Sequence, residues 1–233
     1  MTLPVPRLFT YTIPIDDGAA PNPFHGMCSL AICKPGIRRT AQKGDWIAGL
    51  GSKHTQNSGD LCGRLVYAMR VDEVVSLEDY DRRTPVDWPH RIPDAGSADL
   101  AERLGDCIYD YSSGMPEQRR GVHGPGNVKT DLGGENVLVS RNFYYFGSQA
   151  IPLPHELLPI CHQTQGHKSK ANAPYVDRFV TWLRSLNLAP GQLYGRPEYI
   201  IDWAEVSSCG GCIIRKLDDD DDDQNDDENG APC

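Results

Sequence analysis

The stretch "GRLVYAMRVDEVV" (Gly63–Val75) decides the fold class, because its side chains alternate with a period of two. That period is typical of a β-strand. A second strand-like run, "WIAGLGS" (Trp46–Ser52), precedes it across a polar linker that contains glycine, as the linker of a hairpin does. We therefore expect the two strands to pair. The residues that share one face of the first are Leu65, Tyr67, Met69 and Val71.

Further strands are predicted on both sides of this pair. "RLFTYTIP" (Arg7–Pro14) alternates bulky and polar residues, and "ENVLVSRNFYYFGSQA" (Glu135–Ala150) predicts two strands that turn at Arg141–Asn142. Successive side chains of a strand point to opposite faces. The aromatic run 143–146 therefore either is buried on both faces or sends one pair of rings out of the core.

Helices are predicted at three places. "SLEDYDRR" (Ser76–Arg83) starts like a capping box, and "SADLAERLG" (Ser97–Gly105) is a short helix with Ser97 as its N-cap. "APYVDRFVTWLRSLN" (Ala173–Asn187) carries a single apolar stripe. Because strands come first and helices are inserted and appended, we expect an α+β fold with a small, strongly curved mixed sheet.

The C-terminal segment, residues 218–233, differs from the rest of the chain in composition. It holds nine acidic residues and no basic one, and without it the chain has 23 of each. Such a block cannot fold alone, so residues 1–216 are predicted to form one domain and residues 217–233 a disordered tail. The tail either keeps the protein in solution, binds protein partners, or competes with phosphates for a basic site.

Several functional classes lack their sequence signals. No apolar run could cross a membrane and no signal peptide is evident, so a cytoplasmic protein with reduced cysteines is expected. The "CGGC" motif at Cys209–Cys212 has no second ligand pair, and we predict no metal and no cofactor. Histidines and serines, including Ser112, His123, His155 and His162, cannot be assembled into a catalytic triad by spacing alone.

Four blocks of the sequence resemble the nucleotide modification associated domain 2 family, over about Arg7 to Leu188. They are "GAAPNPFHGMCSLAICKPGIRRTAQKGDWIAGLGS", "GRLVYAMRVDEVVSLEDY", "GDCIYDY" and "NVLVSRNFYYFGSQA". The resemblance implies a role in systems that make, read or restrict modified nucleotides. The "KGDW" strand and its neighbour are also similar to PUA-like barrels, including the EVE, YTH and ASCH domains, which implies a PUA-like barrel with appended helices.

A basic turn, "KPGIRRTAQK", precedes the strand that starts at Trp46. Cations and free N–H groups bind phosphate, and aromatic rings stack on bases. We therefore expect a site that binds a nucleotide, or nucleic acid with a modified base. The residues predicted to contact the ligand are Asn22, Lys34, Arg38, Arg39, Asp45, Trp46, Asp106, Tyr109, Tyr144 and Tyr145.

Two functions remain open. The first is recognition of a modified base or nucleotide, within a nucleic-acid modification or defence-related system. The alternative is an enzyme that acts on such a ligand by hydrolysis or group transfer, which needs two titratable groups within hydrogen-bond reach. Candidate reactive residues for the enzyme are His25, Cys28, Cys33, Asp45 and Asp106.

Overall fold

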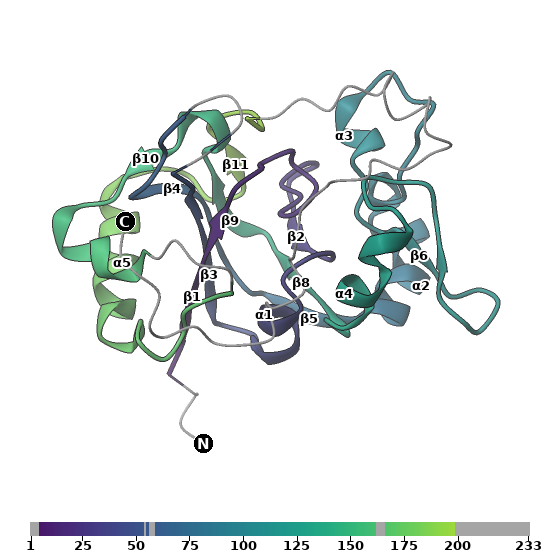
Figure 1. The fold of residues 1–233 in the computed structure, drawn as a ribbon, viewed down its shortest axis with the longest axis horizontal. Helices are drawn as coiled ribbons and strands as arrows, with labels where there is room; N and C mark the ends of the chain where they lie inside the picture. Colours follow the sequence, from purple (N-terminus) through teal and green to yellow (C-terminus); the bar gives the residue numbers. More distant parts are fainter. Residues whose placement is uncertain (1–4, 54, 56–58, 162–165, 199–233) are drawn as a thin grey trace.

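The computed structural model describes residues 5–53, 55, 59–161 and 166–198. A mixed six-stranded sheet lies at its centre (Figure 1). The strand order is β1-β3-β4-β9-β11, and β10 pairs with β4. The pairs β1–β3 and β9–β11 are parallel, whereas β3–β4, β4–β9 and β4–β10 are antiparallel. The bounds are β1 Leu8–Ile13, β3 Trp46–Gly51, β4 Arg64–Arg70, β9 Asn142–Tyr145, β10 Ile151–Pro152 and β11 Gln192–Leu193.

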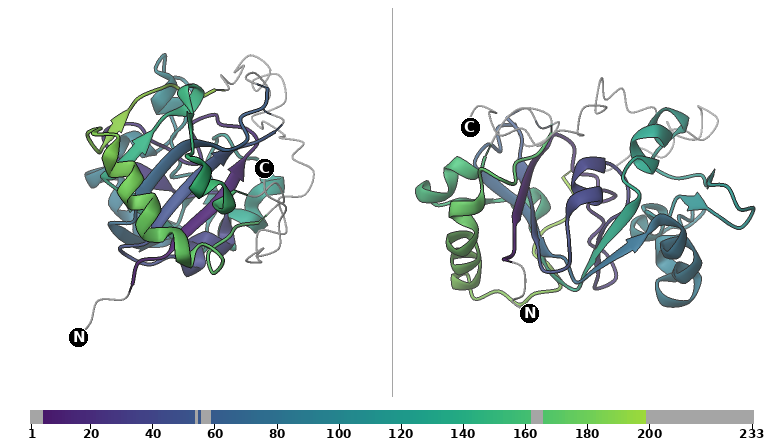
Figure 2. Two further views of the ribbon diagram at one scale, coloured as in Figure 1. Left: turned by 90° about the vertical axis from the view of Figure 1, so that its left-hand side faces the viewer. Right: turned by 90° about the horizontal axis from the view of Figure 1, so that it is seen from below.

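A smaller antiparallel sheet packs beside the first. Its order is β2 (Cys28–Leu30), β8 (Asn136–Ser140) and β5 (Glu73–Ser76). Side chains of both sheets form one core, which contains Tyr67 of the large sheet and Leu138 of the small sheet. Helix α5 (Val176–Ser185) covers the other face of the large sheet (Figure 2). Since both faces are covered, the aromatic run 143–146 is buried on both sides.

The large sheet is open, so the predicted strong curvature and the PUA-like barrel are wrong. The reason lies where the chain passes between the sheets, once after β4 and once between β8 and β9. Asp72 fastens both passages: its Oδ2 accepts a hydrogen bond from the N–H of Arg141 at 2.6 Å, and its own N–H donates to the carbonyl of Val139 at 2.9 Å. The run 63–75 thus supplies strands to two sheets instead of one barrel wall.

Residues 77–135 form a second group of elements, called the α2–α4 lobe below, on the far side of the small sheet (Figure 1). It packs through two further apolar clusters. Its elements are α2 Leu77–Asp87, η1 Pro89–Arg91, α3 Leu100–Arg103, β6 Tyr109–Asp110, β7 Glu117–Gln118, η2 Pro125–Asn127 and α4 Val128–Leu132. The remaining helices are α1 Pro35–Thr40, η3 Gly147–Gln149, η4 His155–Ile160 and η5 Ala173–Tyr175.

Local signals place most helix starts correctly. The Ser76 side chain accepts from the N–H of Asp79 at 3.1 Å and begins α2, as its capping pattern predicts. Helix α3 begins later than expected, because Asp99 rather than Ser97 caps it through the N–H of Ala101. Helix α5 confirms the predicted apolar stripe.

Some predictions concern residues without a described structure. The tail 217–233, the motif 209–212 and His162 lie outside the described residues. Within the described ranges, no helix combines the length and apolar character that a membrane span requires. Cys62 is disulfide-bonded, so the prediction of reduced thiols is wrong for it. The free thiols in the described part are those of Cys28, Cys33, Cys107 and Cys161.

Candidate active site

Cys33 lies between β2 and α1, directly before Lys34, the N-cap of α1. Cys33 and Lys34 both have positive φ, 57° and 43°, a conformation that costs about 1–3 kcal/mol per non-glycine residue and persists only where surrounding contacts fix it. Those contacts are present. The N–H of Cys33 donates to Asp131 Oδ1 at 2.9 Å, and its carbonyl accepts from Arg38 Nε at 2.7 Å. The backbone of Cys33 is therefore fixed on both sides, and its side chain is half-buried.

His123 comes from the loop between β7 and η2, in the α2–α4 lobe. Its Nε2 lies 3.4 Å from the Sγ of Cys33, and its Nδ1 lies 2.7 Å from Oδ2 of Asp131. The amide of Gln118 donates to the carbonyls of His123 and Gly124, at 3.2 and 3.0 Å, and so holds this loop. One imidazole thus bridges a thiol and a carboxylate.

Asp131 lies on α4 and is fully buried. Besides His123 and the N–H of Cys33, it accepts a hydrogen bond from the hydroxyl of Tyr109 at 3.0 Å. Three hydrogen bonds to one carboxylate leave it little freedom to rotate. Asp131 therefore fixes the orientation of the imidazole and the position of the backbone that carries the thiol.

The electrostatics of the cluster favour a charged imidazole. Burial alone would lower the pKa of His123, but Cys33 and Asp131 outweigh it and raise that pKa well above its usual range. Burial opposes ionisation of Asp131, yet His123, the Cys33 N–H and Arg38 lower the pKa of this carboxyl. The arrangement can hold an imidazolium 3.4 Å from the sulfur of Cys33, where it could assist a thiol nucleophile.

Arg38 stabilises the backbone of the site from the protein interior. It is fully buried on α1 and donates to the carbonyls of Cys33 at 2.7 Å, Ala31 at 2.6 Å and Asn136 at 3.0 Å, and also to that of Asp131. The sequence predicts Arg38 as a ligand-binding residue, and the structure places its guanidinium in the interior, against four backbone carbonyls. The guanidinium instead joins the segment that carries the thiol to the segment that carries Asp131.

Cys33, His123 and Asp131 also form the one group of potential metal ligands among the described residues, with ligand atoms within 4.8 Å of one another. The two imidazole nitrogens face different partners, since Nε2 faces the thiol and Nδ1 the carboxylate. Because one ligand atom from each of the three residues lies within 4.8 Å of the others, the group has the size of a cation site. The same three residues also have the order nucleophile, base and orienting carboxylate of a catalytic triad.

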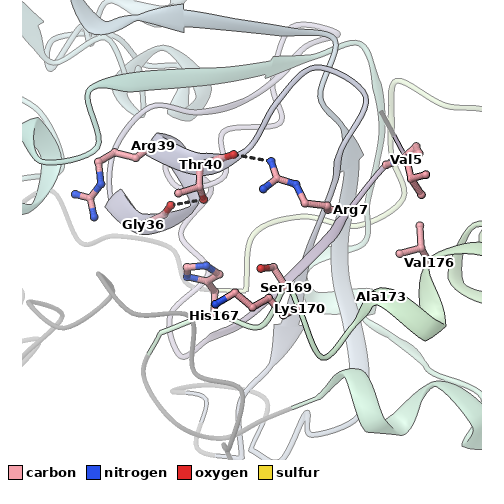
Figure 3. Close-up of a pocket in the computed structure, with 11 residues that line it drawn as sticks. Val5, Arg7, Gly36, Arg39, Thr40, His167, Ser169, Lys170, Ala173 and Val176 are labelled. Carbon is pink, nitrogen blue, oxygen red and sulfur yellow. Dashed lines mark hydrogen bonds between the residues drawn. The ribbon is translucent and has the colours of Figure 1, made fainter. Parts of the chain in front are cut away.

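A cavity of about 620 Å³ opens on the side of α1 that faces residues 167–176. Figure 3 shows side chains of α1 on one side of it and those of 167–170 on the other. Its residues are Val5, Pro6, Arg7, Gly36, Arg39, Thr40, His167, Ser169, Lys170, Ala173 and Val176. The thiol and the cavity are therefore both positioned by α1.

A family model described as nucleotide modification associated domain 2 matches residues 5–205. The chain belongs to this family. The resemblance seen in the sequence is thereby confirmed, and membership associates the chain with nucleotide modification systems. No curated protein and no solved structure matches the chain significantly.

Three of the residues that the sequence indicated lie near the triad or the cavity of this family member. The Tyr109 hydroxyl contacts Asp131. Lys34 follows Cys33, and its Nζ lies 5.2 Å from the centre of the Tyr11 ring. Arg39 lines the cavity and donates to the carbonyl of Gly133 at 2.6 Å.

Asn22 and Asp106 are buried and join segments of the α2–α4 lobe and the small sheet. The Asn22 amide donates to the carbonyl of Leu104 at 2.8 Å. Asp106 accepts from the hydroxyls of Ser29 at 2.5 Å and Tyr80 at 2.8 Å. Burial raises the pKa of Asp106. Both side chains are engaged in packing contacts within the protein.

The other predicted contacts lie in or beside the core. Asp45 pairs with Arg7 at 2.7 Å, and Trp46 packs edge-on against Phe179 with ring centroids 6.2 Å apart. The rings of Tyr144 and Tyr145 are buried on opposite faces of β9. None of these rings is presented at the triad.

Among the residues considered for an enzyme, Cys33 alone meets a base. Cys28 is fully buried, and His25 stacks on His90 with ring centroids 4.2 Å apart. His123 was noted in the sequence without a partner, and Asp131 was missed. One signal could have drawn attention to His123: the sequence "GVHGPG" places this histidine in a glycine-rich loop. No comparable local signal marks Asp131.

Proposed function

We propose that this chain is a thiol-dependent enzyme that acts on a nucleotide or modified base. The observation that carries the proposal is the bridge of the His123 imidazole between Cys33 Sγ and Asp131 Oδ2, at 3.4 and 2.7 Å. A nucleophile, a base within reach and a third group that orients the base are the signature of covalent catalysis. Membership in the nucleotide modification associated domain 2 family suggests that the substrate is a nucleotide or a modified base.

The chemistry assigns one role to each residue. The Cys33 thiolate attacks a trigonal carbon such as that of an amide or amidine, and a sulfur–carbon bond forms. As the leaving group departs with the bonding electrons, the imidazolium of His123 gives it a proton. His123 then takes a proton from water or another acceptor, which attacks the same carbon and releases the thiolate. Asp131 holds the imidazole in place and stabilises its charged form throughout.

The alternative, recognition of a modified base without catalysis, has less support from the side chains. A reading module would use exposed aromatic rings, and Trp46, Tyr144 and Tyr145 are buried. A reading module also has no need of a histidine held between a thiol and a carboxylate. Catalysis accounts for the cluster, and ligand binding would then be one of its steps.

Alkylation of the full chain with iodoacetamide, followed by peptide mass spectrometry, tests the proposal. Cys33 should react much faster than Cys28, Cys107 and Cys161, which are buried. At about pH 6, His123→Ala should slow the alkylation of Cys33 by at least about tenfold, the lower range of base assistance. Asp131→Asn should slow it less.

The buried cysteines serve as internal controls for unfolding. A variant in which Cys28 becomes reactive has lost its fold and is not informative, so circular dichroism accompanies each measurement. If Cys33 in a folded His123→Ala protein reacts like wild type, the triad proposal fails. Stoichiometric zinc that leaves in Cys33→Ser would instead favour a metal centre.

A further inference from the structure

We propose that the triad also binds a zinc ion reversibly, between Cys33 Sγ and His123 Nε2, and that the bound ion switches the thiol off. This inference rests on the proposed function, because it assigns an inhibitor to the same nucleophile. The residue types are the first support, since zinc in proteins is bound by thiolate sulfur, imidazole nitrogen and carboxylate oxygen. Cys33, His123 and Asp131 supply one of each, within 4.8 Å of one another.

The separation of the sulfur and the nitrogen suits a zinc ion. The distance from Cys33 Sγ to His123 Nε2 is 3.4 Å. In a tetrahedral site, with zinc–sulfur and zinc–nitrogen distances of about 2.3 and 2.1 Å, these two ligand atoms lie about 3.6 Å apart. A zinc ion can therefore take the place of a proton between Sγ and Nε2 with only a small shift of the two side chains.

Asp131 prepares the imidazole for this role. Its Oδ2 lies 2.7 Å from Nδ1 of His123, and a carboxylate can only accept, so Nδ1 is the donor. A carboxylate on the second ring nitrogen is the usual partner of a zinc-binding histidine, because it fixes the ring and raises the basicity of the ligand. The Tyr109 hydroxyl at 3.0 Å and the Cys33 N–H at 2.9 Å hold this carboxylate in turn. The two ligand atoms are thus positioned before an ion arrives.

The same site favours exchange of the ion over permanent binding. Only a thiolate and an unprotonated ring nitrogen bind zinc, so Sγ and Nε2 give up their protons when the ion enters. Protons therefore compete with zinc at both atoms, and two direct ligands hold the ion less firmly than the four of a structural site. Cys33 is half-buried, whereas His123 and Asp131 are buried, so the ion enters and leaves on the side of the thiol.

A zinc ion at this place blocks the proposed chemistry. It occupies the electron pair with which the thiolate attacks carbon, and it occupies the nitrogen that transfers the proton. Release of the ion restores both groups. The two ligands are 90 residues apart in the sequence, so the short spacing that marks a motif such as Cys209–Cys212 does not find this site.

Alkylation of the full chain in the presence of zinc tests the inference. The protein is treated with EDTA, the EDTA is removed, and the reaction of iodoacetamide is followed on the peptide that contains Cys33. With ZnSO4 at about 100 μM, the rate at Cys33 should fall by at least about tenfold, as a dissociation constant of about 10 μM or less requires. Fresh EDTA should restore the rate. MgSO4 at the same concentration should leave it unchanged, because magnesium prefers oxygen ligands.

Two histidine variants locate the effect. In His123→Ala, zinc should slow the alkylation of Cys33 by less than about twofold, because the nitrogen ligand is gone. His155→Ala removes an exposed histidine outside the group and should keep the protection seen in wild type. Cobalt provides a measurement that does not depend on alkylation: the absorption of Co²⁺ bound to thiolate should be weaker in Cys33→Ser than in wild type.

The outcomes separate this inference from the proposed function. An unchanged rate in zinc, equal protection by magnesium, protection that persists in a folded His123→Ala protein, or equal cobalt spectra of wild type and Cys33→Ser would overturn the zinc site. Zinc that survives EDTA would overturn reversible inhibition. In each of the first four cases the enzyme still stands if His123→Ala slows alkylation of the metal-free protein. Zinc protection in wild type, with no effect of His123→Ala on the metal-free rate, would support the zinc site and remove the enzyme.

Discussion

At the scale of single residues, Arg38 shows that part of the basic turn 34–43 has a structural role. Its guanidinium reaches four backbone carbonyls and no solvent, so its replacement would leave buried acceptors unpaired, at about 1–3 kcal/mol each. Loss of binding in an Arg38 variant would therefore reflect loss of structure. Arg39, one residue later, is half-buried and lines the cavity. Adjacent arginines of the same turn thus differ in place: Arg38 holds backbone segments together in the interior, and Arg39 lines the cavity.

Asp16 gives a pH-dependent prediction. Burial raises its pKa from 3.8 to about 6, against the hydrogen bond from the Tyr145 hydroxyl. The folded state then holds the Asp16 proton more tightly than the unfolded state. The contribution of Asp16 to stability is therefore largest below pH 3.8, falls as the pH rises to about 6, and is level above that. The loss amounts to about 3 kcal/mol.

Asp16→Asn should remove most of this decline. Urea unfolding of wild type and variant at about pH 4 and about pH 7.5 measures it. Ordinary carboxyls are only about half ionised at pH 4, so a control variant at an ordinary carboxyl is needed. Asp177→Asn, at an exposed position on α5, is the matched control. The assignment fails if Asp16→Asn and Asp177→Asn lose the same stability between the two pH values.

At the scale of elements, the contact between α1 and the end of α4 holds the triad together. Gly134 follows α4, and a Cβ at this position would overlap the guanidinium of Arg38. Gly134→Ala should therefore destabilise the protein by about 1–3 kcal/mol, the cost of overpacking, and slow alkylation of Cys33. Gly126→Ala, with no atom within 4 Å of the added methyl, should change stability by less than about 0.5 kcal/mol.

Denaturant melts and alkylation rates of the two glycine variants provide the comparison. If Gly134→Ala keeps wild-type stability, Arg38 can move aside, and its four hydrogen bonds do not fix the site. If stability falls and the alkylation rate does not, the thiol depends on His123 and not on the α1–α4 contact.

Elements that carry a local pattern are predictable from the sequence. The alternation of β1, the cap of α2 and the stripe of α5 each lie within one stretch. The sheet that a strand joins is not decided within one stretch of sequence. At Asp72, the passage from one sheet to the other depends on Val139 and Arg141, far along the chain. The triad is hidden for the same reason: nothing local in Cys33 indicates a partner 90 residues away.

The acidic end of the chain matters at the scale of the whole molecule. Nine carboxylates within residues 218–228 are tethered to an otherwise neutral chain. If the proposed enzyme binds an anionic nucleotide, these carboxylates can compete for the same site at an effective concentration on the order of millimolar. Deletion of residues 218–233 should tighten nucleotide binding several-fold at low salt. The gain should shrink as the Debye length falls to about 8 Å near physiological ionic strength.

A salt titration of full-length and truncated protein tests this effect. The truncated protein should keep its melting temperature, since residues 1–216 are proposed to form the domain. Equal affinities of the two proteins at every salt concentration would leave the acidic end with a role in solubility alone. Unfolding on truncation would place the domain boundary elsewhere.

The triad residues lie far apart in the sequence, and this separation has a consequence for biosynthesis. A nascent chain exposes Cys33 long before His123 and Asp131 have been translated, because the thiol and the carboxylate that fixes its backbone are 98 residues apart. Until then Cys33 is an ordinary thiol, and contacts of such long sequence separation form slowly. If Cys33 is the proposed nucleophile, its activation therefore waits until the α2–α4 lobe has docked, and an unfinished chain carries only an ordinary thiol.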